Sequence, residues 1–285
     1  MIKRNIIKKK LQTLCRLFTF SLFLNVCTLS LEPAQAAAET NTKSSSAFGY
    51  MEYTGYLDES GWSKRDAFKN CDYDGDGLTD RVFRKEQAGN TLTCSYRIDF
   101  GNGKRLWIRD ADWTGTPVIQ AGDLDADGRN EILFTQEYYM STDPASAGNM
   151  RLYHNKGGKY KLEKLPLPNS VYNPFQPCLT LIYQIGKKDT YRLTVKETGY
   201  NAKFSFTKSS LEEMGLETFY NTFFDGEEYE TPVYQANIQK TGKRMSILCR
   251  VRLLGMFCAD EIQFRIVSTD HGYAVKNMNY VPSKL

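Results

Sequence analysis

A nine-residue acidic pattern occurs twice in this chain of 285 residues, and the two copies are 51 positions apart. It reads DYDGDGLTD over Asp72–Asp80 and DLDADGRNE over Asp123–Glu131. Each copy has carboxylates at positions one, three and five, a glycine at position six and a fourth carboxylate at position nine. Four carboxylates so close together repel one another unless a cation compensates their charge. The chain must therefore adopt a fold that presents the same acidic loop twice.

These residue types form an all-oxygen ligand set, which suits a hard cation and Ca²⁺ above all. We expect the three alternating aspartates to supply side-chain oxygens, the seventh residue a backbone carbonyl and the ninth a closing carboxylate. The expected ligands are Asp72, Asp74, Asp76, Leu78 and Asp80 in the first copy, and Asp123, Asp125, Asp127, Arg129 and Glu131 in the second. Because Glu131 is one carbon longer than aspartate, we expect weaker binding there. We expect the calcium to order the loops rather than to contact a ligand.

The flanking residues distinguish this pattern from an EF-hand, which needs a bidentate glutamate at position 12 and a helix on either side. Position 12 is Phe83 in the first copy and Phe134 in the second. Both lie in short β-branched and aromatic runs, which predict strands. A hairpin turn rich in Gly and Asn follows each copy, at 101–103 and 155–158. Each unit therefore predicts four antiparallel strands, which is typical of one blade of a β-propeller.

The second copy with its flanks, AGDLDADGRNEIL over Ala121–Leu133, resembles the FG-GAP/VCBS-type repeat of integrin-α-like propellers and of many secreted bacterial proteins. The first copy is similar over Asp72–Asp80, but it has Asn70-Cys71 where the second has Ala121-Gly122. The resemblance implies β-blades that hold calcium in hairpin loops, and it implies neither a partner nor an activity. The chain is too short for the seven blades of an integrin-type propeller. Four or five blades, an open array, or a partial propeller on another β domain all fit.

Beyond the second unit the acidic pattern stops, but the strand pattern continues. Period-two alternation predicts strands at 179–183, 191–196, 203–207, 246–254, 261–268 and 272–281. Ser210–Glu213 has the form of a capping box and predicts one short helix to about Tyr220. The acidic run Asp225–Glu230 predicts a solvated loop. The expected fold is mainly β, a small or partial β-propeller of antiparallel four-stranded blade-like repeats with a β-rich C-terminal part.

The first 36 residues have the features of a secretory signal peptide, with a basic start, an apolar stretch over Leu17–Leu31 and a cleavage motif at Ala34-Gln35-Ala36. The apolar stretch is shorter than the ~20 residues that span a bilayer, which favours cleavage over a permanent anchor. The full chain has 37 basic and 33 acidic residues, and removing the six basic and one acidic residues of the signal leaves 31 and 32, a net charge of −1. This near-neutral charge does not favour nucleic-acid or membrane binding.

The predicted organisation follows from these boundaries. It comprises a signal peptide at 1–36, a flexible leader at 37–49 and two calcium-loop repeats at 50–168. A β-rich region follows at 169–285, either as degenerate blades or as a separate domain. We expect a secreted, extracellular protein without stable membrane insertion after signal cleavage.

Five cysteines lie outside the predicted signal peptide, namely Cys71, Cys94, Cys178, Cys249 and Cys258. Because the number is odd, at least one is unpaired or pairs between chains. The candidate disulfides are Cys71–Cys94 and Cys249–Cys258, and buried thiols that behave as small hydrophobes are the alternative.

The titratable residues favour a binding protein over an enzyme. The chain has two histidines, His154 and His271, and lacks the HExxH, CxxC, GxSxG and nucleotide-binding patterns. We interpret Ser268, Asp270 and His271 as a solvated turn, because three neighbours in one turn rarely converge as a catalytic triad. A pair of carboxylates in a glycosidase stays possible, because their partnership is spatial.

The longest insertion in the second unit, Tyr138–Met150, is the candidate ligand surface, since long loops on repeat scaffolds tend to carry binding. We expect a secreted calcium-binding β-repeat protein that binds an extracellular protein or glycan. The alternatives are an extracellular hydrolase or lyase acting on polysaccharide and an envelope-associated structural protein.

Overall fold

The structure is a computed structural model, and it describes residues 48–50, 63–64, 71–86, 93–112, 116–137, 149–171, 173–185, 190–205, 226–253 and 260–282. Ser45–Leu285 form one compact unit. The regular structure within the described ranges is all β-strand, and no helix there is long and apolar enough to cross a membrane. The predicted signal peptide, the helix predicted at 210–220 and most of Tyr138–Met150 lie outside these ranges.

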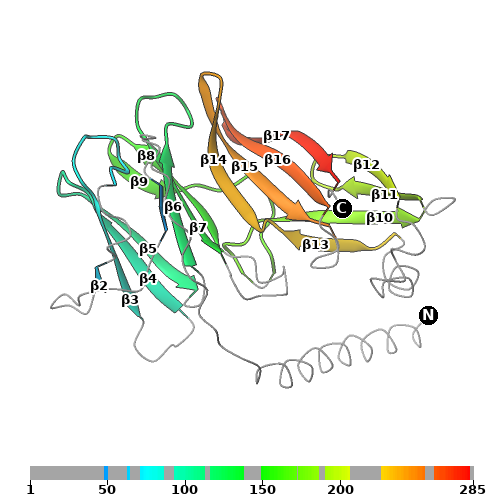
Figure 1. Ribbon diagram of the computed structural model, residues 1–285, viewed down its shortest axis with the longest axis horizontal. Coiled ribbons are helices and arrows are strands. Elements are labelled where there is room, and N and C mark those ends of the chain that lie inside the picture. The colour runs from blue at the N-terminus through cyan, green and yellow to red at the C-terminus, as the bar shows by residue number, and fades with distance from the viewer. Residues whose placement is uncertain are drawn as a thin grey trace, which may run out of the picture. The chain divides into compact units, whose positions relative to one another are not determined.

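Each acidic-loop unit contributes four antiparallel strands in chain order to one sheet (Figure 1). The first sheet contains β2 (Ser63–Lys64), β3 (Arg81–Glu86), β4 (Thr93–Asp99) and β5 (Arg105–Asp112). The second contains β6 (Thr116–Gly122), β7 (Glu131–Glu137), β8 (Met150–Lys156) and β9 (Lys159–Leu162), with β1 (Phe48–Tyr50) paired to β6. Each unit contains four antiparallel strands, as predicted, but the residues directly before loop 1, where its first strand was expected, lie outside the described ranges. Strand β1 overlaps the predicted leader at 37–49.

Two further antiparallel sheets follow (Figure 1). One has the order β12-β11-β10-β13 and contains β10 (Cys178–Ile185), β11 (Thr190–Val195), β12 (Tyr200–Ser205) and β13 (Glu228–Pro232). The other contains β14 (Gln235–Thr241), β15 (Arg244–Arg252), β16 (Glu261–Thr269) and β17 (Gly272–Val281) in chain order. The fold is therefore mainly β, as predicted. Each sheet keeps two open edges, so the described strands do not close a barrel.

The solvated loop predicted over Asp225–Glu230 is wrong, because part of it belongs to β13, which pairs with β10. An edge strand tolerates charged side chains on its exposed face. Glu228 is exposed and ion-paired with Lys196 at 2.7 Å, whereas Tyr229 is half-buried against Tyr183, with ring centroids 6.1 Å apart. The alternation of outward and inward residues along β13 was present in the sequence, but the acidic outward residues made the segment resemble a solvated loop.

The sheet of β6–β9 lies between two apolar cores. Along β7, Ile132 and Phe134 join side chains of β3, β4 and β5, whereas Leu133 joins side chains of β10, β11, β15 and β16. All three side chains are fully buried, and burial of each contributes about 2–3 kcal/mol. Gln120 of β6 adds polar contacts to β14, since its Oε1 accepts from Ile238 N at 2.7 Å. The strand that follows the second acidic loop is therefore anchored on both faces.

The described cysteines are thiols rather than disulfides. Cys71, Cys94, Cys178 and Cys249 are all buried and none is disulfide-bonded. The candidate pairing of Cys71 with Cys94 is therefore not formed, and Cys258 lies outside the described residues. Burial raises the pKa of the Cys178 thiol to about 12, so it behaves as a small apolar side chain.

Candidate metal centre

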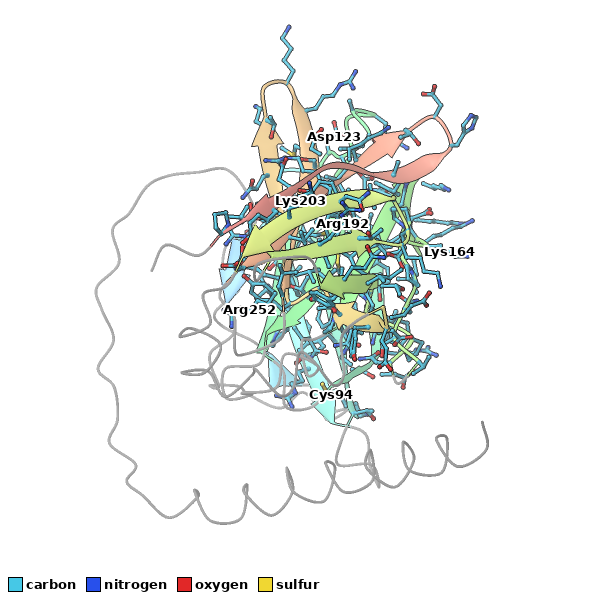
Figure 2. All side chains as sticks on the ribbon, turned by 90° about the vertical axis from the view of Figure 1, so that its right-hand side faces the viewer. Cys94, Asp123, Lys164, Arg192, Lys203 and Arg252 are labelled. Atoms are coloured by element: carbon cyan, nitrogen blue, oxygen red, sulfur yellow. The ribbon has the colours of Figure 1, made fainter. Side chains whose placement is uncertain are left out.

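Loop 1 (residues 72–80) and loop 2 (residues 123–131) connect antiparallel segments at the same register. In loop 1 Cys71 pairs with Asp80, and in loop 2 Gly122 pairs with Glu131. In both cases the residue before the loop thus faces the ninth residue of the pattern. Figure 2 labels Asp123, the first residue of loop 2, at the opposite end of the sheets from Cys94.

Backbone amides fold each loop around its first aspartate. The Oδ1 of Asp72 accepts a hydrogen bond from Asp76 N at 3.1 Å, and its Oδ2 accepts one from Gly77 N at 2.9 Å. In loop 2 the equivalent bonds run to Asp123 from Asp127 N at 3.1 Å and from Gly128 N at 3.0 Å. Short side-chain-to-backbone bonds of this kind replace the regular ladder in a turn. The two loops therefore share one conformation, although five of their nine residues differ.

The third and fifth residues of the pattern also make equivalent hydrogen bonds in the two loops. The amide of Leu78 donates to Asp76 Oδ1 at 2.8 Å, and the amide of Arg129 donates to Asp127 Oδ1 at 2.9 Å. The fifth residue also donates to the third in both loops, at 3.3 Å to Asp74 and at 3.2 Å to Asp125. Leu78 and Arg129, predicted to offer backbone carbonyls, both occupy exposed loop positions.

The closing carboxylates differ from the others because they are buried. Asp80 is 1% exposed and Glu131 is 0% exposed. One oxygen of each accepts from the amide of the second loop residue, at 2.6 Å from Tyr73 N and 2.8 Å from Leu124 N. The other accepts from a distant hairpin turn, at 2.9 Å from Gly101 N in loop 1 and at 3.5 Å from Asn155 N in loop 2. The ninth residue thus ties each loop to the hairpin that follows it.

Burial makes the charge of these two carboxylates unfavourable. It raises the pKa of Asp80 to about 6, and backbone hydrogen bonds and the nearby carboxylates of Asp74 and Asp72 adjust that value. Burial likewise raises the pKa of Glu131 to about 7, with Asp125 and Asp127 as the neighbouring charges. A bound cation supplies the opposite charge that such a site lacks. The donor set therefore fits a metal ion.

The structure brings three carboxylates together in each loop. Oxygens of Asp72, Asp74 and Asp80 lie within 4.8 Å of one another, and so do oxygens of Asp123, Asp125 and Asp127. These acidic clusters can hold a metal ion. Within the part of the chain that the structure describes, Asp76 and Glu131 lie outside these two groups, although Glu131 joins Asp125 and His154 in a third.

Two further side chains, which the sequence did not identify as site residues, approach the loops. Asn102, in the turn between β4 and β5, donates from Nδ2 to Asp74 Oδ2 at 2.6 Å and to Asp76 Oδ2 at 2.8 Å. His154 of β8 places Nε2 3.4 Å from Asp125 Oδ2. The sequence signal for both was the hairpin that follows each acidic loop, because antiparallel pairing returns its turn to the loop end of the sheet.

The two loops are neighbours. Tyr160 of β9 donates from its hydroxyl to Asn130 O in loop 2 at 3.2 Å, and its ring stacks on Phe100 with centroids 5.1 Å apart. A Cβ atom at Gly75 of loop 1 would lie 3.1 Å from Asn130 Nδ2. The first and second sheets therefore meet at their loop ends, with Tyr160 between the two acidic loops.

Ala126→Gly is expected to stabilise the protein, and Gly75→Ala is expected to destabilise it, each by about 1 kcal/mol. Both residues occupy the fourth loop position with a positive φ, 64° at Ala126 and 78° at Gly75. This left-handed conformation strains an alanine and not a glycine. Urea unfolding of the two variants measures the effect. Changes of the same sign would contradict the equivalence of the two loops.

No protein-family model matches this chain, and no curated protein matches it. The resemblance to FG-GAP/VCBS-type repeats therefore rests on the residues of the two loops and stays a prediction.

Proposed function

We propose that this chain is a secreted calcium-binding β-repeat protein, in which two Ca²⁺ ions order the acidic loops of neighbouring sheets and which binds a protein or glycan outside the cell. The recurrence of one hydrogen-bonded loop conformation around converging carboxylates carries the proposal. Ca²⁺ is the cation of choice because it accepts six to eight oxygen ligands in flexible geometry. The exposed loop faces leave room for water to complete such a shell.

The arrangement of the sheets supports a blade-like architecture, a small or partial propeller. Each sheet has four antiparallel strands, apart from the added β1. The sheet of β6–β9 buries both faces, one against side chains of β3–β5 and the other against side chains of the C-terminal sheets. Blades of a propeller are packed in this face-to-face way. Calcium in the connecting loops stabilises such thin sheets, which by themselves have small cores.

A candidate contact surface lies around the exposed Trp107 of the first sheet, next to the buried Arg97. Phe83, Arg97 and Trp107 are directly paired across β3, β4 and β5, so their side chains share one face. The Arg97 guanidinium lies 4.5 Å from the centroid of Phe83 and 5.7 Å from that of Trp107, and Trp107 is 42% exposed. Aromatic rings with an adjacent arginine are typical of surfaces that bind sugar rings or partner proteins.

Calorimetric titration with Ca²⁺ tests the proposal. The parent protein is expected to bind two ions, and Asp74→Asn or Asp125→Asn to bind only one, because each removes a charge from one acidic cluster. Asp270→Asn, in an exposed turn, is the control and keeps both sites. The calcium-loaded protein and its Trp107→Ala variant are then screened against glycan and protein arrays. Absence of calcium binding, or turnover of a polysaccharide, contradicts the proposal.

A further inference from the structure

Loop 2 has an imidazole where loop 1 has a phenyl ring. The closing carboxylates of Asp80 and Glu131 accept from Gly101 N and Asn155 N, so these two amides are equivalent. The residues immediately before them are Phe100 and His154. Phe100 is buried and stacks on Tyr160, whereas His154 is half-buried beside the carboxylates of loop 2. The two loops thus share a conformation but differ in one potential ligand.

The contacts of the His154 ring orient its Nε2 toward the loop. Nε2 lies 3.4 Å from Asp125 Oδ2, and Nδ1 lies 3.9 Å from Glu163 Oε1. Glu163 is itself ion-paired with Lys156, at 3.2 Å. A carboxylate that accepts from the distal ring N–H commonly orients a metal-binding histidine, and Glu163 lies on that side of the ring, although at 3.9 Å it is an ion-pair contact rather than a hydrogen bond. The Nε2 atom is therefore the one available to an ion in loop 2.

Three donors of mixed type converge there. One ligand atom each of Asp125, Glu131 and His154 lies within 4.8 Å of the other two. They come from three elements, namely the loop, the start of β7 and β8. Three ligands bound to one ion at about 2.0–2.2 Å lie about 3.0–3.8 Å from one another, and the 3.4 Å between Asp125 Oδ2 and His154 Nε2 already falls in this range.

A buried tyrosine hydroxyl that the charges of this cluster influence lacks a hydrogen-bond partner among the described residues. It belongs to Tyr273 of β17. Burial, and after it the charges of Glu131, Asp125 and Glu163, raises the pKa of Tyr273, so the hydroxyl lies within electrostatic reach of these carboxylates. A buried hydroxyl without a partner is costly, and a bound ion with its water shell can provide one.

We propose that loop 2 also binds a divalent first-row transition ion, Mn²⁺ or Zn²⁺, through Asp125, Glu131 and His154, whereas loop 1 accepts only oxygen-ligated cations such as Ca²⁺. An imidazole nitrogen is a poor ligand for Ca²⁺ but a good one for transition ions. This inference deepens the proposed function, on which it rests for the role of loop 2 as a cation site. Loop 2 then binds transition ions that loop 1 does not bind.

Titration of the full chain with Zn²⁺ alone, and with Ca²⁺ in saturating Zn²⁺, tests this selectivity. We expect Zn²⁺ to displace one of the two Ca²⁺ ions. His154→Gln is expected to weaken Zn²⁺ binding at least 30-fold and Ca²⁺ binding less than threefold, because it removes the nitrogen ligand alone. His271→Gln, in an exposed turn of β16–β17, is the matched control and leaves both affinities within twofold. Pulsed EPR of bound Mn²⁺ is expected to show ¹⁴N coupling that His154→Gln abolishes.

Unchanged Zn²⁺ affinity in His154→Gln would overturn the inference. An equal loss of Zn²⁺ and Ca²⁺ affinity would also overturn it, because His154 would then support the loop rather than bind the ion. Thermal melting of each variant confirms that it folds. If Zn²⁺ binding depends on His154 while neither loop binds Ca²⁺, the calcium proposal fails and the transition-metal site stands. If the chain binds two Ca²⁺ ions that Zn²⁺ cannot displace, the calcium proposal stands and the transition-metal site fails.

Discussion

Removal of calcium by a chelator is expected to lower the midpoint of thermal unfolding by about 10–20 °C. A ligand that binds only the folded state stabilises it by about 2.7 kcal/mol at a hundredfold excess over its Kd. Two loops of equivalent conformation therefore supply about 5 kcal/mol together. For a unit of this size, 1 kcal/mol corresponds to about 2–4 °C. The effect is large because the ion compensates three converging carboxylates in each loop at once.

Scanning calorimetry in saturating calcium and in excess chelator measures this shift. The double variant Asp74→Asn/Asp125→Asn is the internal control, because it removes one carboxylate from each acidic cluster. Its melting midpoint is expected to respond to the chelator by less than half as much as that of the parent. Mg²⁺ is expected to replace calcium poorly, since it requires a smaller and more regular shell. Coincident melting curves with and without chelator would mean that the acidic loops are stable turns without a cation.

The local part of this structure was predictable from the sequence, and the part that depends on strand register was not. Phe83 and Phe134 lie in β3 and β7, as the runs around them predict, and the four strands of each unit follow from their hairpin turns. The contact of Asn102 with Asp74 spans 28 residues and depends on where β4 pairs with β3. His154 reaches loop 2 through the same kind of pairing, between β7 and β8.

The burial of the closing carboxylates also could not be predicted from the sequence. The pattern marked Asp80 and Glu131 as ligands of the same kind as the other aspartates, but the structure buries both and gives each two backbone donors. A sequence shows that a residue is charged, whereas its desolvation depends on all the chain packed around it. Likewise, β13 was missed because the acidic side chains on its exposed face resemble those of a solvated loop.

Burial of Glu131 determines whether its contribution to stability rises or falls with pH. In the metal-free protein its pKa is about 7, above the 4.5 of an ordinary glutamate. The folded state therefore holds the proton more tightly, and this contribution to stability is fully present below about pH 4 and lost as the pH rises through about 7. Metal-free protein is thus expected to melt at a higher temperature at pH 5 than at pH 8. A bound cation removes the penalty on the ionised form, so the calcium-loaded protein is not expected to lose stability over this range.

The effect of Glu131→Gln on stability at pH 8 is consequently expected to have opposite signs without and with calcium. Without the ion, the neutral amide avoids the cost of a buried charge and raises the free energy of unfolding by about 2 kcal/mol. It can still accept from Leu124 N, and it forfeits only the long contact to Asn155 N at 3.5 Å. With calcium, the variant lacks one anionic ligand and is expected to unfold about 4–8 °C below the parent. Thermal melts of parent and variant with and without chelator measure both signs.

The matched control is Glu197→Gln, which alters an exposed carboxylate outside the loops that accepts from Thr180 N. Its effect is expected to be the same with and without calcium, because no cation compensates that charge. If Glu131→Gln destabilised the protein equally in both conditions, Glu131 would act only as an acceptor for two backbone amides. A reversal of sign confined to Glu131 would instead show that the buried ninth residue couples metal binding to folding stability. The apolar surroundings of this carboxylate then tolerate its ionised form only beside a cation.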